Sequence, residues 1–159
     1  MSLNQELKLH APIATTQHEA LLNIYFTSTL IRKRGTEFLR AFGLTDVQIN
    51  VMMLLGHQAR RNEGLSQARL SDMMLVNRAN ITGLIDRMEK AGLVVRTADP
   101  EDRRTNIIKL TARGRRLLDK VEPHYGKEVA RIMGVLKNSE QKTLMKMLEK
   151  VRANLRLDT

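Results

Sequence analysis

The sequence predicts a mainly α-helical fold with one small β-hairpin, and three observations support this. Residues 77–93 carry apolar side chains at helical spacing. Residues 94–110 contain two β-branched runs with a turn between them. Residues 16–42 and 140–155 carry more apolar side chains than one buried helix face needs. We therefore expect a helix–turn–helix followed by a hairpin, with a helical dimerisation lobe built from both chain ends.

The chain begins with a polar stretch and one long helix. Residues 1–15 are mixed in composition, and we interpret them as a flexible arm. The helix begins at Thr16 or Gln17 and runs to about Ala41. Gly43 ends it, because glycine adopts the left-handed conformation at little cost.

Two shorter helices follow. Thr45 is an N-cap with Gln48 at the capping-box position, and the nearly apolar helix behind it is typical of a core helix. Ser66 caps a third helix, Gln67–Leu75. With the next helix this arrangement predicts helix–turn–helix geometry, in which the second helix lies in the DNA major groove.

That second helix is expected to be the recognition helix. Asn77 suits its N-cap, and Gly92 ends it. Its buried stripe consists of Ile81, Leu84, Ile85 and Met88. Its exposed face carries residue types that read base edges or hold phosphates: Arg78, Asn80, Thr82 and Arg87. An ordinary solvated helix face explains these four residues equally well, so the helix alone does not decide the function.

The hairpin favours DNA binding. Asp99-Pro100 begins its turn, and two adjacent arginines, Arg103 and Arg104, lie at its tip. Arginine is not a residue that a turn itself requires, but its long cationic side chain is well suited to enter a DNA minor groove.

Two helices close the chain. Thr111 caps the first, and Pro123 inside it is expected to kink or break it. The last helix begins near Ser139 and has near-heptad apolar spacing. Dimerisation through the terminal helices would set two recognition helices roughly 34 Å apart, about one turn of DNA.

These segments resemble the MarR family of bacterial winged helix–turn–helix regulators. The resemblance covers nearly the whole chain and rests on three stretches: Leu70-Ser71-Asp72 through Gly92-Leu93-Val94, then Asp99-Pro100-Glu101-Asp102-Arg103-Arg104, then Lys109-Leu110-Thr111-Ala112-Arg113-Gly114. It implies that the hairpin is the wing, that Arg104 enters the minor groove, and that Asp102 helps to orient the tip.

The resemblance also implies a domain plan and a ligand. The plan is a DNA-binding domain over residues 44–111 and a dimerisation lobe from residues 16–43 and 112–159. Relatives of this kind sense small, often anionic aromatic molecules in a crevice beside the lobe. The residues at matching places are His18, Tyr25, Met52 and His57. Each of these four is as well explained by ordinary packing in a core.

Composition narrows the classes of function. The net charge is +10, and residues 77–120 hold eleven basic and six acidic side chains, so half of the excess surrounds the expected recognition helix. The absence of cysteine leaves no disulfide or thiolate metal site. Four scattered histidines suggest no metal site, and we expect no cofactor and no enzyme activity. No apolar run is long enough for a membrane span, so we expect a cytoplasmic protein.

The function that the sequence favours is a homodimeric, sequence-specific transcriptional regulator, and we favour repression over activation. It would bind double-stranded DNA at a near-palindromic operator and respond to a ligand. One alternative is an architectural binder with no sequence preference. Another is a protein-interaction adaptor that uses the winged fold without DNA.

Overall fold

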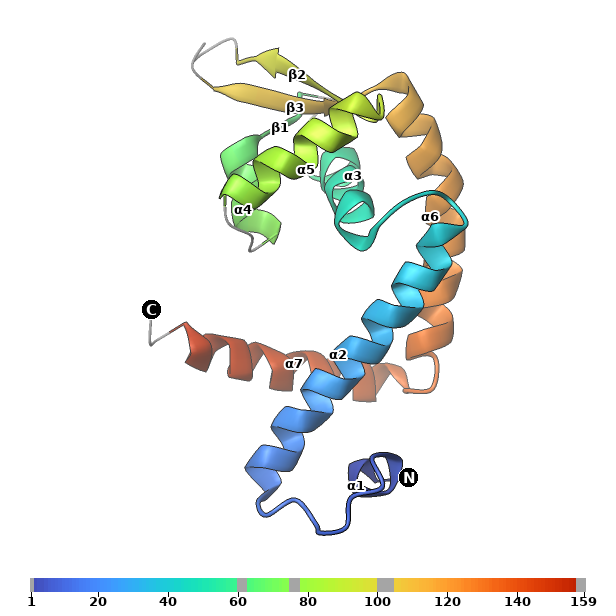
Figure 1. The fold of residues 1–159 in the computed structure, drawn as a ribbon, viewed down its shortest axis with the longest axis vertical. Helices are drawn as coiled ribbons and strands as arrows, with labels where there is room; N and C mark the ends of the chain where they lie inside the picture. Colours follow the sequence, from blue (N-terminus) through green and yellow to red (C-terminus); the bar gives the residue numbers. More distant parts are fainter. Residues whose placement is uncertain (1, 60–62, 75–77, 100–104, 157–159) are drawn as a thin grey trace. The chain divides into compact units, whose positions relative to one another are not determined.

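The structure, a computed structural model, describes residues 2–59, 63–74, 78–99 and 105–156, with only the backbone of residues 78 and 79. These residues form seven helices and three short strands (Figure 1). In chain order they are α1 (Leu3–Glu6), α2 (Thr16–Arg40), α3 (Asp46–His57), β1 (Leu65–Ser66), α4 (Gln67–Met74), α5 (Arg78–Lys90), β2 (Val94–Ala98), β3 (Asn106–Leu110), α6 (Ala112–Met133) and α7 (Asn138–Leu155). The predicted mainly helical fold with a small hairpin is confirmed.

Local side-chain caps explain where the helices begin. Thr15 caps α2 by accepting a backbone hydrogen bond from the first turn at 3.2 Å. Thr45 and Gln48 form the expected capping box at α3, with amide-to-side-chain distances of 2.9 and 3.4 Å. The Ser66 hydroxyl accepts from the amide of Arg69 at 3.2 Å, which confirms it as the cap of α4.

Two glycines end helices as expected. Gly43 after α2 and Gly92 after α5 have φ values of 66° and 67°, in the left-handed region that glycine adopts at least cost. Asn77, the expected cap of α5, lies outside the described residues.

The sheet contains one strand more than the predicted hairpin. β1 pairs antiparallel with β3 on the side away from β2, in the order β1-β3-β2. Gly64 makes this possible, because a Cβ there would lie only 2.4 Å from the carbonyl oxygen of Ile108. A two-residue strand leaves no periodic pattern, so β1 could not be predicted from the sequence.

The core of the first compact unit, Met1–Arg115, lies where α3, α4 and α5 meet the sheet (Figure 1). Its fully buried side chains come from these elements and from α2: Leu39, Ile49, Val51, Met52, Leu70, Ile81, Ile85, Met88, Val94 and Ile108. Because α5 packs against both α4 and β2, its rotation about its own axis is fixed.

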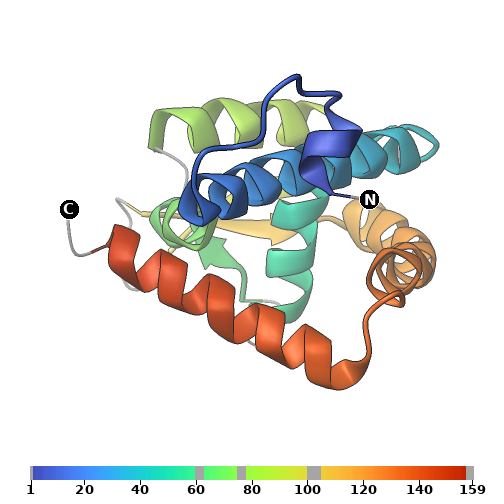
Figure 2. The same ribbon diagram turned by 90° about the horizontal axis from the view of Figure 1, so that it is seen from below.

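Helix α6 bears on the kink or break expected at Pro123. The helix continues past Pro123 to Met133, so it does not break there, and the kink stays a prediction. A proline removes one backbone hydrogen bond, and the turns on either side keep theirs. At its start the Thr111 hydroxyl accepts from the amide of Gly114 at 2.9 Å, which confirms that cap. Figure 2 shows α7 as an unbroken helix.

The chain ends bear on the predicted domain plan. The arm predicted over residues 1–15 contains α1, in which Leu3 is buried, and its flexibility stays a prediction. The chain divides into two compact units, Met1–Arg115 and Arg116–Thr159, so α2 is grouped with the sheet and α3–α5. The dimerisation lobe concerns two chains and also stays a prediction.

Candidate nucleic-acid interface

The outward side of α5 is a row of three residues. Gly83 lies two residues from both Ile81 and Ile85, which are fully buried, and two residues correspond to about 200° around a helix. Gly83 therefore points away from the core. Arg87 and Lys90 follow one and two turns later on the same side, and both side chains are exposed. We call Gly83, Arg87 and Lys90 the outer row.

The two cations of the outer row are available to a ligand. Within the part of the chain that the structure describes, the side chains of Arg87 and Lys90 make no hydrogen bond and no ion pair. Cations on a helix that projects from a fixed core bind phosphate oxygens, and arginine also binds guanine edges. Lys90 and Gly83 are absent from the set of residues predicted from the sequence, because neither differs in type from ordinary surface residues.

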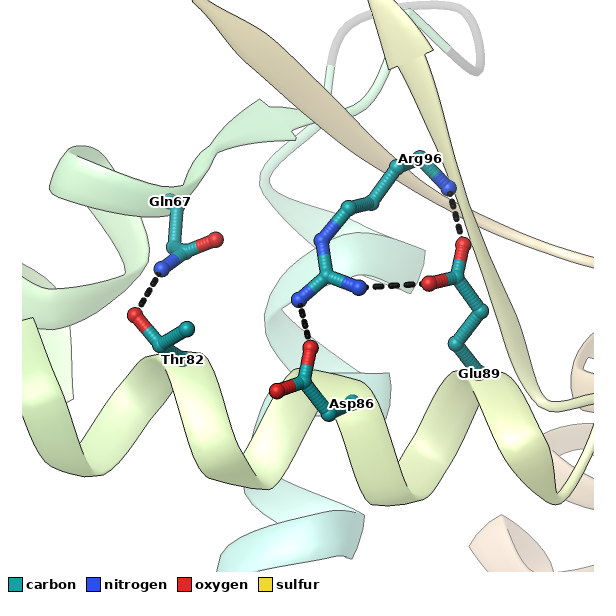
Figure 3. Close-up of polar contacts among 5 residues, drawn as sticks. All are labelled: Gln67, Thr82, Asp86, Glu89 and Arg96. Carbon is teal, nitrogen blue, oxygen red and sulfur yellow. Dashed lines mark hydrogen bonds and ion pairs between the residues drawn. The ribbon is translucent and has the colours of Figure 1, made fainter.

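Thr82 lies to one side of the outer row and is held by α4. The side-chain amide of Gln67 donates to the Thr82 hydroxyl oxygen at 2.5 Å (Figure 3). Gln67 is the first residue of α4, where polar side chains also contact phosphates in helix–turn–helix proteins. The sequence could not indicate this pair, because the two residues are fifteen positions apart.

The other predicted residues of α5 are placed less completely. Asn80 is exposed and lies two residues from Thr82, so the two flank the outer row on opposite sides. Arg78 is the first residue of α5, and only its backbone is described.

Three charged residues link α5 to the wing, and we call them the Arg96 clamp. Figure 3 shows the guanidinium of Arg96, in β2, between two carboxylates on α5. Its Nη1 donates to Glu89 at 2.5 Å, and its Nη2 donates to Asp86. The backbone amide of Arg96 also donates to Glu89, at 2.9 Å.

The Arg96 clamp also compensates the negative charge that two carboxylates place on α5. The backbone hydrogen bond from Arg96 is the main cause that lowers the pKa of Glu89; burial opposes it and the guanidinium adds to it. Two carboxylates on a helix that approaches phosphates would repel them. Arg96 offsets that repulsion and also fixes β2 against the helix.

The wing is described up to its tip. The amide of Asp99 donates to the carbonyl of Thr105 at 2.9 Å, which closes the base of the turn. Asp102, Arg103 and Arg104, the residues predicted to reach the minor groove, lie outside the described residues.

The predicted ligand residues do not gather in one place. Met52 is fully buried in the core. His18 and Tyr25 are exposed on α2. His57 lines an open hollow of about 490 Å³ between α3 and the end of α4, together with Val47, Asn50, Met53, Leu54, Gln58, Met73 and Met74. Of the four residues, His57 alone borders this hollow, in which three methionines provide adaptable apolar walls.

A metal site and a membrane span are both absent from the described residues. Residues 2–59, 63–74, 78–99 and 105–156 contain no group of three His, Cys, Asp or Glu side chains arranged to hold a metal ion. Over the same ranges, no helix is both long and apolar enough to cross a membrane.

Known proteins similar to this chain are transcriptional regulators. The transcriptional activatory protein BadR of Rhodopseudomonas palustris is 34% identical over 108 residues, which cover 65% of this chain and 61% of BadR, less than two thirds of its length. The HTH-type transcriptional regulator MhqR of Bacillus subtilis is 30% identical over 112 residues, which cover 70% of this chain and 74% of MhqR.

Solved structures share the fold. AbsC, a MarR family regulator from Streptomyces coelicolor, superposes with a TM-score of 0.82 at 24% identity, over 92% of this chain and 99% of AbsC. CouR from Rhodococcus jostii, solved with p-coumaroyl-CoA, gives 0.76 at 24% identity, over 87% and 95%. MepR of S. aureus, solved with DNA, gives 0.74 at 21% identity, over 83% and 94%.

The sequence pattern of the MarR family itself matches residues 42–105, the segment that runs from the end of α2 to the wing. The match to MhqR covers 74% of that protein, and its 112 residues make it longer than the segment 42–105. This chain therefore belongs to the MarR family of winged helix–turn–helix transcriptional regulators.

Proposed function

We propose that this protein is a sequence-specific DNA-binding regulator that acts as a homodimer. The observation that carries the proposal is the outer row of α5, which presents the exposed cations Arg87 and Lys90 away from a packed core. The Arg96 clamp fixes the wing against the same helix, so one rigid unit offers a major-groove element and a minor-groove element. The solved complex of MepR with DNA supports this reading. Since the DNA of bacteria lies in the cytoplasm, the function implies a cytoplasmic location.

The dimer is proposed from exposed apolar surface. On α2 six large apolar side chains are exposed: Leu21, Ile24, Tyr25, Phe26, Leu30 and Ile31. On α7 five more are exposed: Leu144, Met145, Met147, Val151 and Leu155. Apolar surface of this extent on helices is typical of an interface, and a second copy of the chain is its natural occupant. The dimer would bind two half-sites roughly 34 Å apart.

Selection of fragments from a random DNA pool tests this function directly. We expect the purified protein to enrich a near-palindrome whose half-sites are separated by about one helical turn. Binding without enrichment of any sequence would favour the architectural alternative. No salt-dependent DNA binding at all would favour the adaptor.

We further propose that the regulator is a ligand-responsive repressor. The hollow beside His57 combines apolar walls with polar groups at its rim, which suits a small anionic aromatic molecule. CouR, solved with p-coumaroyl-CoA, supports a ligand of this general kind. A ligand that binds one spacing of the recognition helices better than another would shift the population of dimers that fit the operator.

Two measurements test whether the protein binds such a ligand and whether it represses or activates transcription. Salicylate, used as a probe, should raise the melting temperature of the parent and weaken operator binding. His57→Ala should reduce both effects, whereas replacement of an exposed histidine outside the hollow, His10→Ala, should leave them unchanged. In transcription with purified polymerase the protein should lower the yield from a promoter that overlaps the operator, and an increase would identify an activator.

A further inference from the structure

Gly83 occupies a position where glycine weakens the fold. It lies in the interior of α5, seven residues before the helix ends at Lys90. Glycine lowers the helix equilibrium several-fold relative to alanine, because it loses more conformational freedom on folding. Its φ is not in the left-handed region, so the backbone conformation does not require glycine.

The surroundings of Gly83 do not require glycine either. Among the described side chains and the backbone outside this stretch of α5, a Cβ built there would meet one atom within 4 Å. That atom is Nη1 of Arg87 at 3.5 Å, an ordinary van der Waals contact with the end of a flexible side chain. Gly114 in α6 shows the contrast. A Cβ at Gly114 would lie 2.1 Å from the carbonyl oxygen of Leu93, so packing allows only glycine there.

Because the fold does not require glycine at position 83, the reason for the missing side chain is sought in a contact with a binding partner. Gly83 lies opposite the buried residues of α5, at the N-terminal end of the outer row, and Arg87 lies one turn further on. A helix inserted in the major groove brings its outermost backbone close to the base edges. At that point even a methyl group would separate the two surfaces.

We propose that Gly83 is a specificity-determining residue at which the backbone of α5 approaches the base edges most closely. The absent side chain leaves space for a base edge, and it also lets the guanidinium of Arg87 lie against the helix and reach neighbouring bases. This inference rests on the proposed function and names the part of the interface that selects the sequence.

The test is Gly83→Ala, with Gly126→Ala as its matched control. Gly126 is also inside a helix, α6. In the described part of the chain, apart from the helix's own nearby backbone, a Cβ there would meet no atom within 4 Å. Both variants replace a glycine inside a helix; Gly83 is half-buried and Gly126 is exposed. We expect each to raise the melting temperature by roughly 2–4 °C. Sedimentation should show the parental mass for both.

Operator binding separates the two variants. Gly83→Ala should bind the selected operator roughly ten-fold or more weakly, the loss typical of one specific contact, while its affinity for unrelated duplexes stays near the parental value. Gly126→Ala should bind both kinds of DNA as the parent does.

Each other outcome overturns the inference. If the parent selects no DNA sequence, the proposed function fails and this inference fails with it. If the parent binds its operator and Gly83→Ala binds equally well, only the role of Gly83 is wrong. A lower melting temperature for Gly83→Ala would show that the fold itself requires the glycine. Equal loss of affinity for specific and unrelated DNA would show that the contact does not read bases.

Discussion

At the level of single residues, we propose that Arg104 is the wing side chain that enters the DNA minor groove. It matches the third position of the Asp-x-Arg motif that begins at Asp102. A narrow A·T-rich minor groove concentrates negative potential, so a guanidinium placed there gains more than on an open surface. The competing role is an exposed ion pair that steadies the hairpin, which contributes at most about 1 kcal/mol.

The substitution Arg104→Ala distinguishes these roles. We expect it to weaken operator binding by roughly 1–3 kcal/mol, while the melting temperature and the dimer mass stay near those of the parent. Arg103→Ala should weaken operator binding by a smaller amount. Fluorescence anisotropy with a labelled operator gives the affinities, and calorimetry gives the stability. Parental affinity for Arg104→Ala, or loss of binding through unfolding, would remove the wing from the interface.

Gln67 belongs to the same scale, because it controls one side chain of α5. Its amide holds the Thr82 hydroxyl, and a net hydrogen bond of this kind contributes about 0.5–1.5 kcal/mol. We expect Gln67→Ala to broaden the base preference next to Thr82 and to lower affinity only slightly. Arg69→Ala, on the exposed side of α4, should instead weaken binding to all sequences alike. Sequencing the DNA selected by each variant makes the comparison, and an unchanged preference for Gln67→Ala would refute it.

At the scale of elements, the Arg96 clamp couples α5 to the sheet. The Arg96 side chain is 22% exposed and that of Glu89 is 37% exposed, so the stabilisation is screened by water. We expect Arg96→Gln to lower the melting temperature by no more than about 2–4 °C. Because the wing then moves relative to α5, operator affinity should fall by a larger factor than stability. Thermal unfolding and anisotropy measured on one preparation would show whether the two losses differ in this way.

The clamp also predicts a pH dependence. The pKa of Glu89 is lower in the folded chain, so its contribution to stability is complete above the ordinary glutamate pKa and is lost as pH falls through the lowered value. The difference in stability between the parent and Arg96→Gln should therefore shrink in acid. The double variant with Glu89→Gln should be less destabilised than the sum of the two single variants. Additive effects at neutral pH would show that the clamp does not act as a unit.

At the scale of the whole molecule, the apolar faces of α2 and α7 predict a dimer. Sedimentation should give twice the 18.2 kDa chain mass. Leu30, which is 60% exposed on α2, provides the test: Leu30→Glu should shift the protein to monomers by placing a charge in the interface. Val135→Glu is the control, because Val135 is more exposed still and lies between α6 and α7. A folded monomer of the parent at micromolar concentration would contradict the paired half-sites.

The net charge predicts how that dimer responds to salt. The chain carries +10, and half of this excess lies between Asn77 and Lys120. The logarithm of affinity should fall with the logarithm of salt concentration at a slope near −0.9 per phosphate contacted. A dimer with several such contacts should lose on the order of 10³-fold in affinity between low and physiological salt. Binding that hardly changes over this range would favour the protein-interaction adaptor.

The features that the amino-acid sequence predicts correctly are those that depend on neighbours within about four residues. The caps at Thr45, Ser66 and Thr111 and the helix ends at Gly43 and Gly92 were all predicted, because a cap or a left-handed glycine acts within one helical turn. The family resemblance was equally local, since it rests on short motifs, and the comparisons confirm it.

The contacts between residues that are distant in the sequence became known only from the folded structure. Gln67 reaches Thr82 from fifteen positions away, and Arg96 reaches Asp86 from ten. Strand β1 exists only because β3 provides a partner for it. The sequence showed which side of α5 is apolar, but packing against α4 and β2 determined what flanks the opposite side. Residue spacing records local geometry, whereas these contacts depend on how distant elements pack.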